Sequence, residues 1–312
     1  MTNTIETVQF PDLTPAEFRR RFQVPGCAVI IQGALDGIAE WNLESLAEAL
    51  GDTRYAARRY GEGHFQTPRQ EWTRYAEAQM VTAHEYAGML SDRSAHRENV
   101  YLAQIDIGGT SAATGIREHV EALGARCDMR RLVPSDINLW LGPSGHTEPL
   151  HFDTGDGTLM QLHGSKRVLL FPPTQTRNLY PFPFAKGPIP PWFSQVDVAQ
   201  PDFNRFPRLR TALNNAIVVT IVPGDVLYIP VHWWHEVTAL GDSYVCSLNR
   251  FWEARPLRRN FCNWRAGALY SMNHVPWRVV MAIDRCIRTV RERRWRRAAH
   301  SDIDQLGQSH DD

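Results

Sequence analysis

Apolar positions in the middle and second half of the chain recur in short runs that predict β-strands. Turn signals, such as Gly164-Ser165, separate neighbouring runs. The expected strands span residues 27–32, 101–107, 137–141, 158–163, 166–171, 216–222, 226–229, 236–239 and 244–251. Many short strands at such spacing are typical of a β-sandwich or a small barrel. Residues 172–214 are rich in proline and aromatic residues, and so long an insert without regular structure usually serves a site.

Helical patterns flank this β region on the N-terminal side. The stretch Thr14-Pro15-Ala16-Glu17 is a capping box with proline at the first helical position, which predicts a short helix to about Phe22. Residues 43–50 predict a helix that Gly51 ends. Residues 70–93 also favour a helix, with a less regular pattern. We therefore expect one domain over residues 1–255, with helices and strands added at its N-terminus.

The C-terminal segment, residues 256–312, reads as helix. Its apolar residues recur at spacings of three, four and three, which forms one seam along a helix: Val280, Ile283, Ile287 and Val290. This seam either packs on the protein's own barrel or joins two copies as a homodimer. The arginines around it indicate a solvated face.

Composition excludes several classes of protein. Thirty-four Lys and Arg residues balance 34 Asp and Glu, so net charge gives no case for nucleic-acid binding. Five scattered cysteines without a CxxC argue against a disulfide scaffold and favour a reducing compartment. The N-terminus lacks the pattern of a signal peptide, and no run approaches the roughly 18 apolar residues that span a bilayer. We expect a cytoplasmic protein without a membrane partner.

The stretch GHTEPLHFDTGDG holds His151 and Asp153, two positions apart. Side chains two apart on an extended strand point to the same face, so an imidazole and a carboxylate would converge. A histidine from a distant strand, such as one of the two in PGDVLYIPVHWWHEV, would complete a face of two histidines and one carboxylate. That face leaves metal positions open, as non-haem Fe(II) oxygenases require. An H-x-D pair alone does not establish a metal site.

Lys166 lies in the apolar run GSKRVLLFPP, which is expected to carry it inward. A buried lysine needs an anionic partner. The distal carboxylate of a metal-chelating 2-oxoglutarate would be such a partner. The alternative is a lysine that extends from a turn to the solvent.

The ordered motifs H-x-D, KRVLLFPP, PGDVLYIP followed by WWH, and NRFW resemble the JmjC and cupin-type Fe(II)/2-oxoglutarate dioxygenases. Within that family the chain is most similar to the asparaginyl hydroxylase of hypoxia-inducible factor, through LYPFPF (179–184), SQVD (194–197) and FNRFP (203–207). The resemblance covers residues 95–255. It implies a mainly β fold with flanking helices, a double-stranded β-helix (jelly-roll) barrel, and the use of Fe(II), 2-oxoglutarate and O₂.

The resemblance also implies roles for individual residues. His151, Asp153 and His235 would bind iron, whereas His232 matches no ligand of the family and would lie behind the site or at the surface. Trp233 and Trp234 would pack the barrel and shield the metal. Residues that would bind the co-substrate are Lys166 and Tyr101, at its distal carboxylate, and Asn249.

The chain departs from the family at several site positions. Glu148 stands where the family often has a Ser or Thr that binds the co-substrate. An anion near a dicarboxylate is unfavourable, so we expect Glu148 to point away from the site and Thr147 to take its place. Gly157 replaces an asparagine. Polar side chains grip the target amide in the asparaginyl hydroxylase, and this chain has Gly155, Trp192 and Phe193 in their place. Trp252 is a further candidate for the substrate pocket.

Four functions follow as hypotheses. The first is hydroxylation of a protein or peptide side chain, which the likeness to a protein hydroxylase favours. The second is hydroxylation of a small molecule, which the loss of amide-gripping residues and the apolar PPWF segment favour. The others are N-methyl-lysine demethylation and a non-catalytic cupin, the latter suggested by Glu148 and Gly157. An open groove beside the metal would favour a peptide, and a closed pocket a small molecule.

Overall fold

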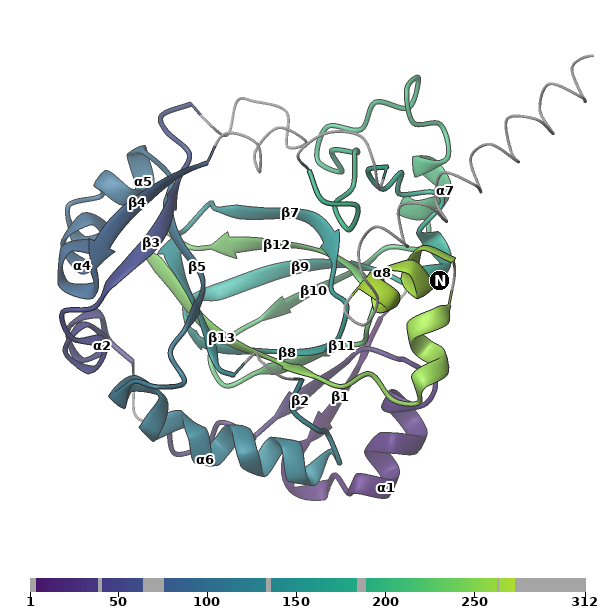
Figure 1. The fold of residues 1–312 in the computed structure, drawn as a ribbon, viewed down its shortest axis with the longest axis horizontal. Helices are drawn as coiled ribbons and strands as arrows, with labels where there is room; N and C mark the ends of the chain where they lie inside the picture. The colour runs from purple at the N-terminus through teal and green to yellow at the C-terminus, as the bar shows by residue number, and fades with distance from the viewer. Residues whose placement is uncertain are drawn as a thin grey trace, which may run out of the picture.

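Two facing β-sheets form the centre of the described chain, and helices lie around them (Figure 1). The computed structural model describes residues 4–38, 41–63, 76–132, 136–183, 189–262 and 264–272. The expected mainly β jelly-roll with flanking helices is confirmed.

Within these residues the larger sheet has nine strands and the smaller sheet four. In spatial order the larger sheet contains β1 (Glu6–Gln9), β2 (Val29–Gln32), β11 (Val226–Ile229), β8 (Asp156–His163), β13 (Tyr244–Trp252), β6 (Asn138–Pro143), β5 (Val100–Asp106), β3 (Arg54–Arg59) and β4 (Glu77–Thr82). The smaller sheet contains β10 (Ile217–Ile221), β9 (Ser165–Phe171), β12 (Trp234–Leu240) and β7 (Thr147–Phe152). The crossing of β7, β9 and β12 to one sheet, and of β8, β11 and β13 to the other, produces the barrel.

Short helices surround the sheets. They are η1 (Phe10–Asp12), α1 (Pro15–Phe18), the π-helical turn η2 (Arg19–Gln23), α2 (Leu43–Leu50), α4 (Ala83–Ser91), α5 (Ser94–Arg97), α6 (Ser111–Arg126), η4 (Pro173–Gln175), α7 (Leu209–Leu213), η5 (Leu257–Phe261) and α8 (Trp264–Met272). Among the residues that the structure describes, none of the helices has the length and apolar character of a membrane span.

The capping signals place the first helices as expected. The Thr14 hydroxyl accepts a hydrogen bond from the Glu17 amide at 3.2 Å, and the helical segment continues through η2 to Gln23. Helix α2 begins after Asn42, whose side chain caps it, and ends at Gly51, which has a φ of 63°. A positive φ is favourable for glycine and costly for most other residues.

The expected helix over residues 70–93 is only partly correct. Residues 64–75 lie outside the described part, residues 77–82 form β4, and α4 begins at Ala83. Thr82 and Glu85 form a capping box, which fixes the start of α4. β4 pairs with β3 along its full length. This distant partner, and not the local pattern, makes the segment a strand.

Helix α6 was not expected, and it corrects the role of Trp252. Its buried residues Ile116, Val120 and Leu123 form an apolar face. The ring of Trp252 packs against Gly124, where a Cβ atom would lie 2.9 Å from the ring. Trp252 is 1% exposed, and its indole nitrogen donates to the Thr158 hydroxyl at 2.9 Å. The prediction that Trp252 lines the substrate pocket is therefore wrong, because its side chain lies between the sheet and α6.

The insert of residues 172–214 contains little regular structure, as expected. Only η4 and α7 are helical among its described residues. Leu179, Phe206 and Leu209 are buried and pack in one cluster with Trp234 of β12. The insert thus covers the smaller sheet at the end where β12 begins.

A buried ion pair ties the beginning of the C-terminal segment to the barrel. Asp156 is fully buried at the start of β8, and both of its oxygens accept from the Arg259 guanidinium, at 2.8 and 2.9 Å. Tyr228 and the amide of Val231 also donate to this carboxylate. The predicted seam of residues 280–290 lies outside the described residues.

We expect Asp156→Ala to lower the free energy of unfolding by about 3–5 kcal/mol, because it leaves the Arg259 guanidinium buried without its partner. Chemical denaturation would measure the change. The matched control is Glu253→Ala, which removes the exposed Arg255–Glu253 pair at 3.2 Å and is expected to cost less than about 1 kcal/mol. Equal losses for the two variants would contradict this account.

Candidate metal and co-substrate site

A cavity of about 310 Å³ opens between the two sheets. Its wall from the smaller sheet carries His151, Lys166 and His235, and its wall from the larger sheet carries Tyr101 and Asn249. Residues that are far apart in sequence therefore meet in one space, as the sequence analysis expected.

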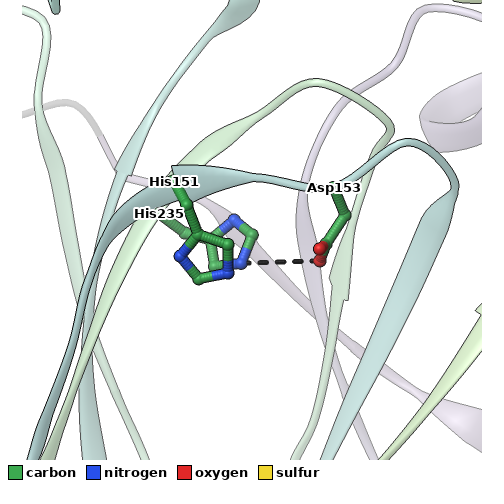
Figure 2. A group of neighbouring side chains, drawn as sticks. All are labelled: His151, Asp153 and His235. Atoms are coloured by element: carbon green, nitrogen blue, oxygen red, sulfur yellow. Dashed lines mark ion pairs between the residues drawn. The ribbon is translucent and has the colours of Figure 1, made fainter. Parts of the chain in front are cut away.

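The side chains of His151, Asp153 and His235 converge at this cavity (Figure 2). One ligand-type atom from each lies within 4.8 Å of the other two. Nε2 of His235 lies 3.5 Å from Oδ2 of Asp153, and the two imidazole rings have centroids 4.3 Å apart. His151 faces His235 directly across the antiparallel pair β7–β12, and Asp153 follows at the end of β7.

Hydrogen bonds orient both imidazoles for metal binding. Nδ1 of His151 lies 2.7 Å from the Pro149 carbonyl, and Nδ1 of His235 lies 3.0 Å from the Trp233 carbonyl. A carbonyl only accepts, so each Nδ1 carries a hydrogen, and each Nε2 is the ring nitrogen left for a metal. Burial lowers the pKa of His235 to about 4, which keeps its ring neutral at pH 7. Metal-ligating histidines typically show this arrangement.

Two imidazoles and one carboxylate form a donor set that suits a non-haem Fe(II) ion. The three residues could therefore hold a metal, with open positions on the cavity side.

Lys166 lines the same cavity and is 3% exposed. Its ammonium group donates to the Ser247 hydroxyl at 2.5 Å, and no carboxylate of the described residues lies within ion-pair distance of it. Burial lowers its pKa to about 8, so the ammonium form still prevails at pH 7. The alternative of a lysine that reaches the solvent is excluded. A buried cation without an anionic partner is costly, and this fits a site that receives a carboxylate from a ligand.

Tyr101 and Asn249 both reach the cavity. The Tyr101 ring stacks on the His146 ring at 3.8 Å between centroids, and burial raises the pKa of its hydroxyl well above the ordinary value. A Cβ atom at Gly142 would lie 2.0 Å from this ring, so the glycine leaves the space that the tyrosine fills. Oδ1 of Asn249 accepts from the Trp140 indole at 2.9 Å, which leaves its amide hydrogens for a ligand.

The expectation for Thr147 and Glu148 is wrong. The pairing of β7 with β12 shifts between His235 and Val237, so two residues of β7, Pro149 and Leu150, oppose one residue of β12. This bulge reverses the alternation of β7 and turns Glu148 toward the cavity. Thr147 instead faces away, and its hydroxyl lies 3.1 Å from that of Thr238.

Glu148 is neutralised by a residue that the sequence analysis missed. The Arg58 guanidinium on β3 donates to both oxygens of Glu148, at 3.2 and 3.4 Å. Nε2 of His146 lies 3.7 Å from the same carboxylate. Burial alone would raise the pKa of Glu148, but Arg58 and His146 outweigh it and hold the pKa at about 2. Arg58 carried no recognisable signal, because β3 itself was not predicted.

Aromatic side chains form the rest of the cavity wall. Trp192 and Phe193 line it, and the Phe193 ring lies 5.3 Å from the His151 ring between centroids. Phe251 lines it as well and was missed. Because strand side chains alternate, the choice of Asn249 should have pointed to Phe251 and not to Trp252.

The two glycines among the departures lie in different places. Gly157 lines the main cavity. Gly155 lines a smaller adjoining pocket of about 190 Å³, which shares Trp192 with the main cavity. A Cβ atom at Gly155 would lie 2.7 Å from the Leu132 side chain, so a larger residue does not fit without movement.

His232 is buried behind the site and does not line the cavity. Its φ is 64°, and its amide donates to the Asp153 carbonyl at 3.1 Å, which holds the backbone of that residue. Trp234 packs against Phe152, and the Trp233 indole donates to the Gly26 carbonyl at 2.8 Å. Both tryptophans pack the barrel, as expected, but neither lines the cavity.

The chain matches the cupin-like domain family over residues 15–258. Lysine-specific demethylase 8 of Xenopus tropicalis is 29% identical over 246 residues, which cover 75% of this chain and 50% of that protein. HSPB1-associated protein 1 of Bos taurus is 41% identical over 121 residues, which are 38% of this chain and 24% of the relative. JmjC domain-containing protein D of Dictyostelium discoideum is 39% identical over 111 residues, or 35% and 23%.

The chain therefore spans half or less of the length of the curated relatives that it matches. The relatives carry JmjC names, which agrees with the resemblance found in the sequence, although closeness to the asparaginyl hydroxylase is not among these findings. JmjC proteins include Fe(II)- and 2-oxoglutarate-dependent oxygenases. The match over most of the chain, the jelly-roll sheets and the converging histidines and aspartate agree on one conclusion: the chain belongs to the cupin-like family that includes the JmjC proteins.

Proposed function

We propose that this protein is an Fe(II)- and 2-oxoglutarate-dependent dioxygenase that hydroxylates a side chain of a protein or peptide. One observation carries the proposal: His151, Asp153 and His235 share a cavity with Lys166, a buried cation for which the described part of the chain offers no carboxylate partner. A metal chelated by a 2-oxo acid that carries a second carboxylate would use both features.

When bound, Fe(II) and 2-oxoglutarate supply the oxidation, in which O₂ gives one oxygen atom to the substrate and the other to succinate, with release of CO₂. The chain holds and orients these groups. Nε2 of His151 and of His235 and the carboxylate of Asp153 would bind the metal. Lys166 and Tyr101 would donate to the distal carboxylate, and the amide of Asn249 would lie near the co-substrate. Trp192 and Phe193 would exclude water from the reacting side of the metal.

The names of the relatives support a protein substrate. One is named a lysine-specific demethylase and another an HSPB1-associated protein. These names favour a protein target but do not choose between hydroxylation and demethylation, which use the same oxidation. The small-molecule alternative is favoured by the apolar wall of Trp192, Phe193 and Phe251 beside the triad. A non-catalytic cupin is less favoured, because Arg58 compensates the charge of Glu148.

The direct test of this function is turnover of 2-oxoglutarate by the Fe(II)-loaded protein. Succinate would be measured first without a substrate and then with pools of peptides and of metabolites. We expect weak uncoupled turnover that a peptide pool increases. Stimulation by the metabolite pool alone would favour the small-molecule alternative, and no succinate under any condition would contradict an oxygenase.

The metal assignment predicts different outcomes for two nearby histidines. His235→Asn should weaken Fe(II) or Mn(II) binding by roughly 100-fold or more, because the loss of a mere orienting partner already costs about 10–100-fold. His232→Asn is the matched control, since asparagine tolerates the positive φ at this position. Calorimetric titration of the metal under anaerobic conditions would measure both variants. If His232→Asn loses the metal and His235→Asn keeps it, the ligand assignment is wrong.

The aromatic wall predicts that asparagine peptides are poor substrates. A buried carboxamide needs matched donors and acceptors, and each unpaired polar atom costs roughly 1–3 kcal/mol. Trp192 and Phe193 offer ring surfaces that suit an apolar or flat group. Mass spectrometry would detect the addition of one oxygen atom. Phe193→Gln should weaken native turnover and modestly improve acceptance of an amide, whereas efficient asparagine hydroxylation by the wild type would refute this interpretation.

A further inference from the structure

Four Asp, Glu, Lys or Arg side chains of the described residues line the cavity. One is Asp153 of the triad, and the other three are Arg58, Glu148 and Lys166. They come from β3, β7 and β9, so three strands of two sheets meet here. The sum of these three charges is one positive charge. That sum depends on Arg58, because without it the charges of Glu148 and Lys166 cancel.

The backbone fixes the positions of both members of the Arg58–Glu148 pair. Arg58 pairs with Tyr101 in the register between β3 and β5, so the two side chains project to the same face and both reach the cavity. Glu148 reaches it because of the bulge in β7. The pair is therefore built by strand register and is not a chance contact of long surface side chains.

The burial of Glu148 strengthens the effect of its negative charge on the cavity. The Glu148 side chain is 8% exposed, and the Arg58 guanidinium lies within 3.4 Å of both of its oxygens. Lys166 donates to Ser247 and forms no ion pair with Glu148. The Arg58 side chain is 37% exposed, so only the Glu148 end of the pair is buried, and the charge of this carboxylate acts more strongly there than it would in water. Arg58 thus forms the ion pair with Glu148, and the Lys166 ammonium is left without a carboxylate partner among the described residues.

We propose that Arg58 determines the specificity of the co-substrate site, because it neutralises Glu148 and so leaves Lys166 available for the distal carboxylate of a dicarboxylic 2-oxo acid. This inference rests on the proposed function. Arg58 is a positioning residue in this account: it acts through Glu148, and Lys166 makes the contact with the acid.

The consequence is a difference between two acids. Without Arg58, Glu148 would keep only the His146 ring, 3.7 Å away, as a partner. Its negative charge would then repel the distal carboxylate of 2-oxoglutarate and compete with it for Lys166. The acid 2-oxobutanoate has the same metal-chelating end but no second carboxylate. Loss of Arg58 should therefore weaken the binding of 2-oxoglutarate more than the binding of 2-oxobutanoate.

The test is calorimetric binding of each acid to the Mn(II)-loaded full chain, without O₂ or turnover. We expect Arg58→Gln to weaken the binding of 2-oxoglutarate by about tenfold or more, since an uncompensated buried charge is costly. The same variant should change the affinity for 2-oxobutanoate by less than about threefold. The double variant Arg58→Gln with Glu148→Gln should recover 2-oxoglutarate binding to within about threefold of the wild type. Glu148→Gln alone should bind it no more weakly than the wild type.

Three results would overturn the inference: wild-type binding of 2-oxoglutarate by Arg58→Gln, an equal loss for both acids, or a double variant as weak as Arg58→Gln. Mn(II) affinity and the unfolding midpoint report whether each variant is folded. If Arg58→Gln does not fold, Glu148→Gln still decides, because a loss of 2-oxoglutarate binding in that variant contradicts the account. Failure of the wild type to bind either acid would instead refute the proposed function itself.

Discussion

The antiparallel pairing of β7 with β12 is the constraint on which the candidate site depends. It sets His151 opposite His235, so two imidazoles from distant parts of the chain share one face of the smaller sheet. Asp153 follows one residue after β7 ends and completes the triad. Further along the same pair, the bulge turns Glu148 inward. A slip of one residue in this register would turn His235 away from the cavity.

The cavity combines apolar walls with a few charges that strand register places. Tyr228 and Arg259 satisfy Asp156 at the base of β8, and Arg58 and His146 satisfy Glu148. Lys166 differs from these groups, because its only hydrogen-bond partner among the described residues is a hydroxyl. Buried charges usually have charged partners, so the exception is where a ligand would contribute most.

Much of the fold could be predicted because the evidence for it is local, and the convergence of His151, Asp153 and His235 could be predicted because ordered motifs resemble a known family. Period-two alternation located most of the barrel strands, caps located α1 and α2, and motif order singled out His151, Asp153 and His235. The failures share a physical cause. β3 and β4 exist through pairing with each other, and a local pattern does not show a partner. Thr147 was chosen over Glu148 because an anion beside a dicarboxylate is unfavourable. The β7 bulge that turns Glu148 inward cannot be read from alternation, and Arg58, which neutralises Glu148, was missed along with its strand. Trp252 was an avoidable error, because alternation from Asn249 points to Phe251.

The central claim is that one cavity binds a metal at the triad and a 2-oxo acid beside Lys166. Anaerobic titration of the protein with Fe(II) and 2-oxoglutarate tests it most directly, because chelation of Fe(II) by a 2-oxo acid produces a visible charge-transfer absorption. The account predicts that this absorption develops only when both are present, saturates at one equivalent per chain, and is lost with Asp153→Ala. Absorption that is unchanged in Asp153→Ala, or its absence in the wild type, would contradict the claim.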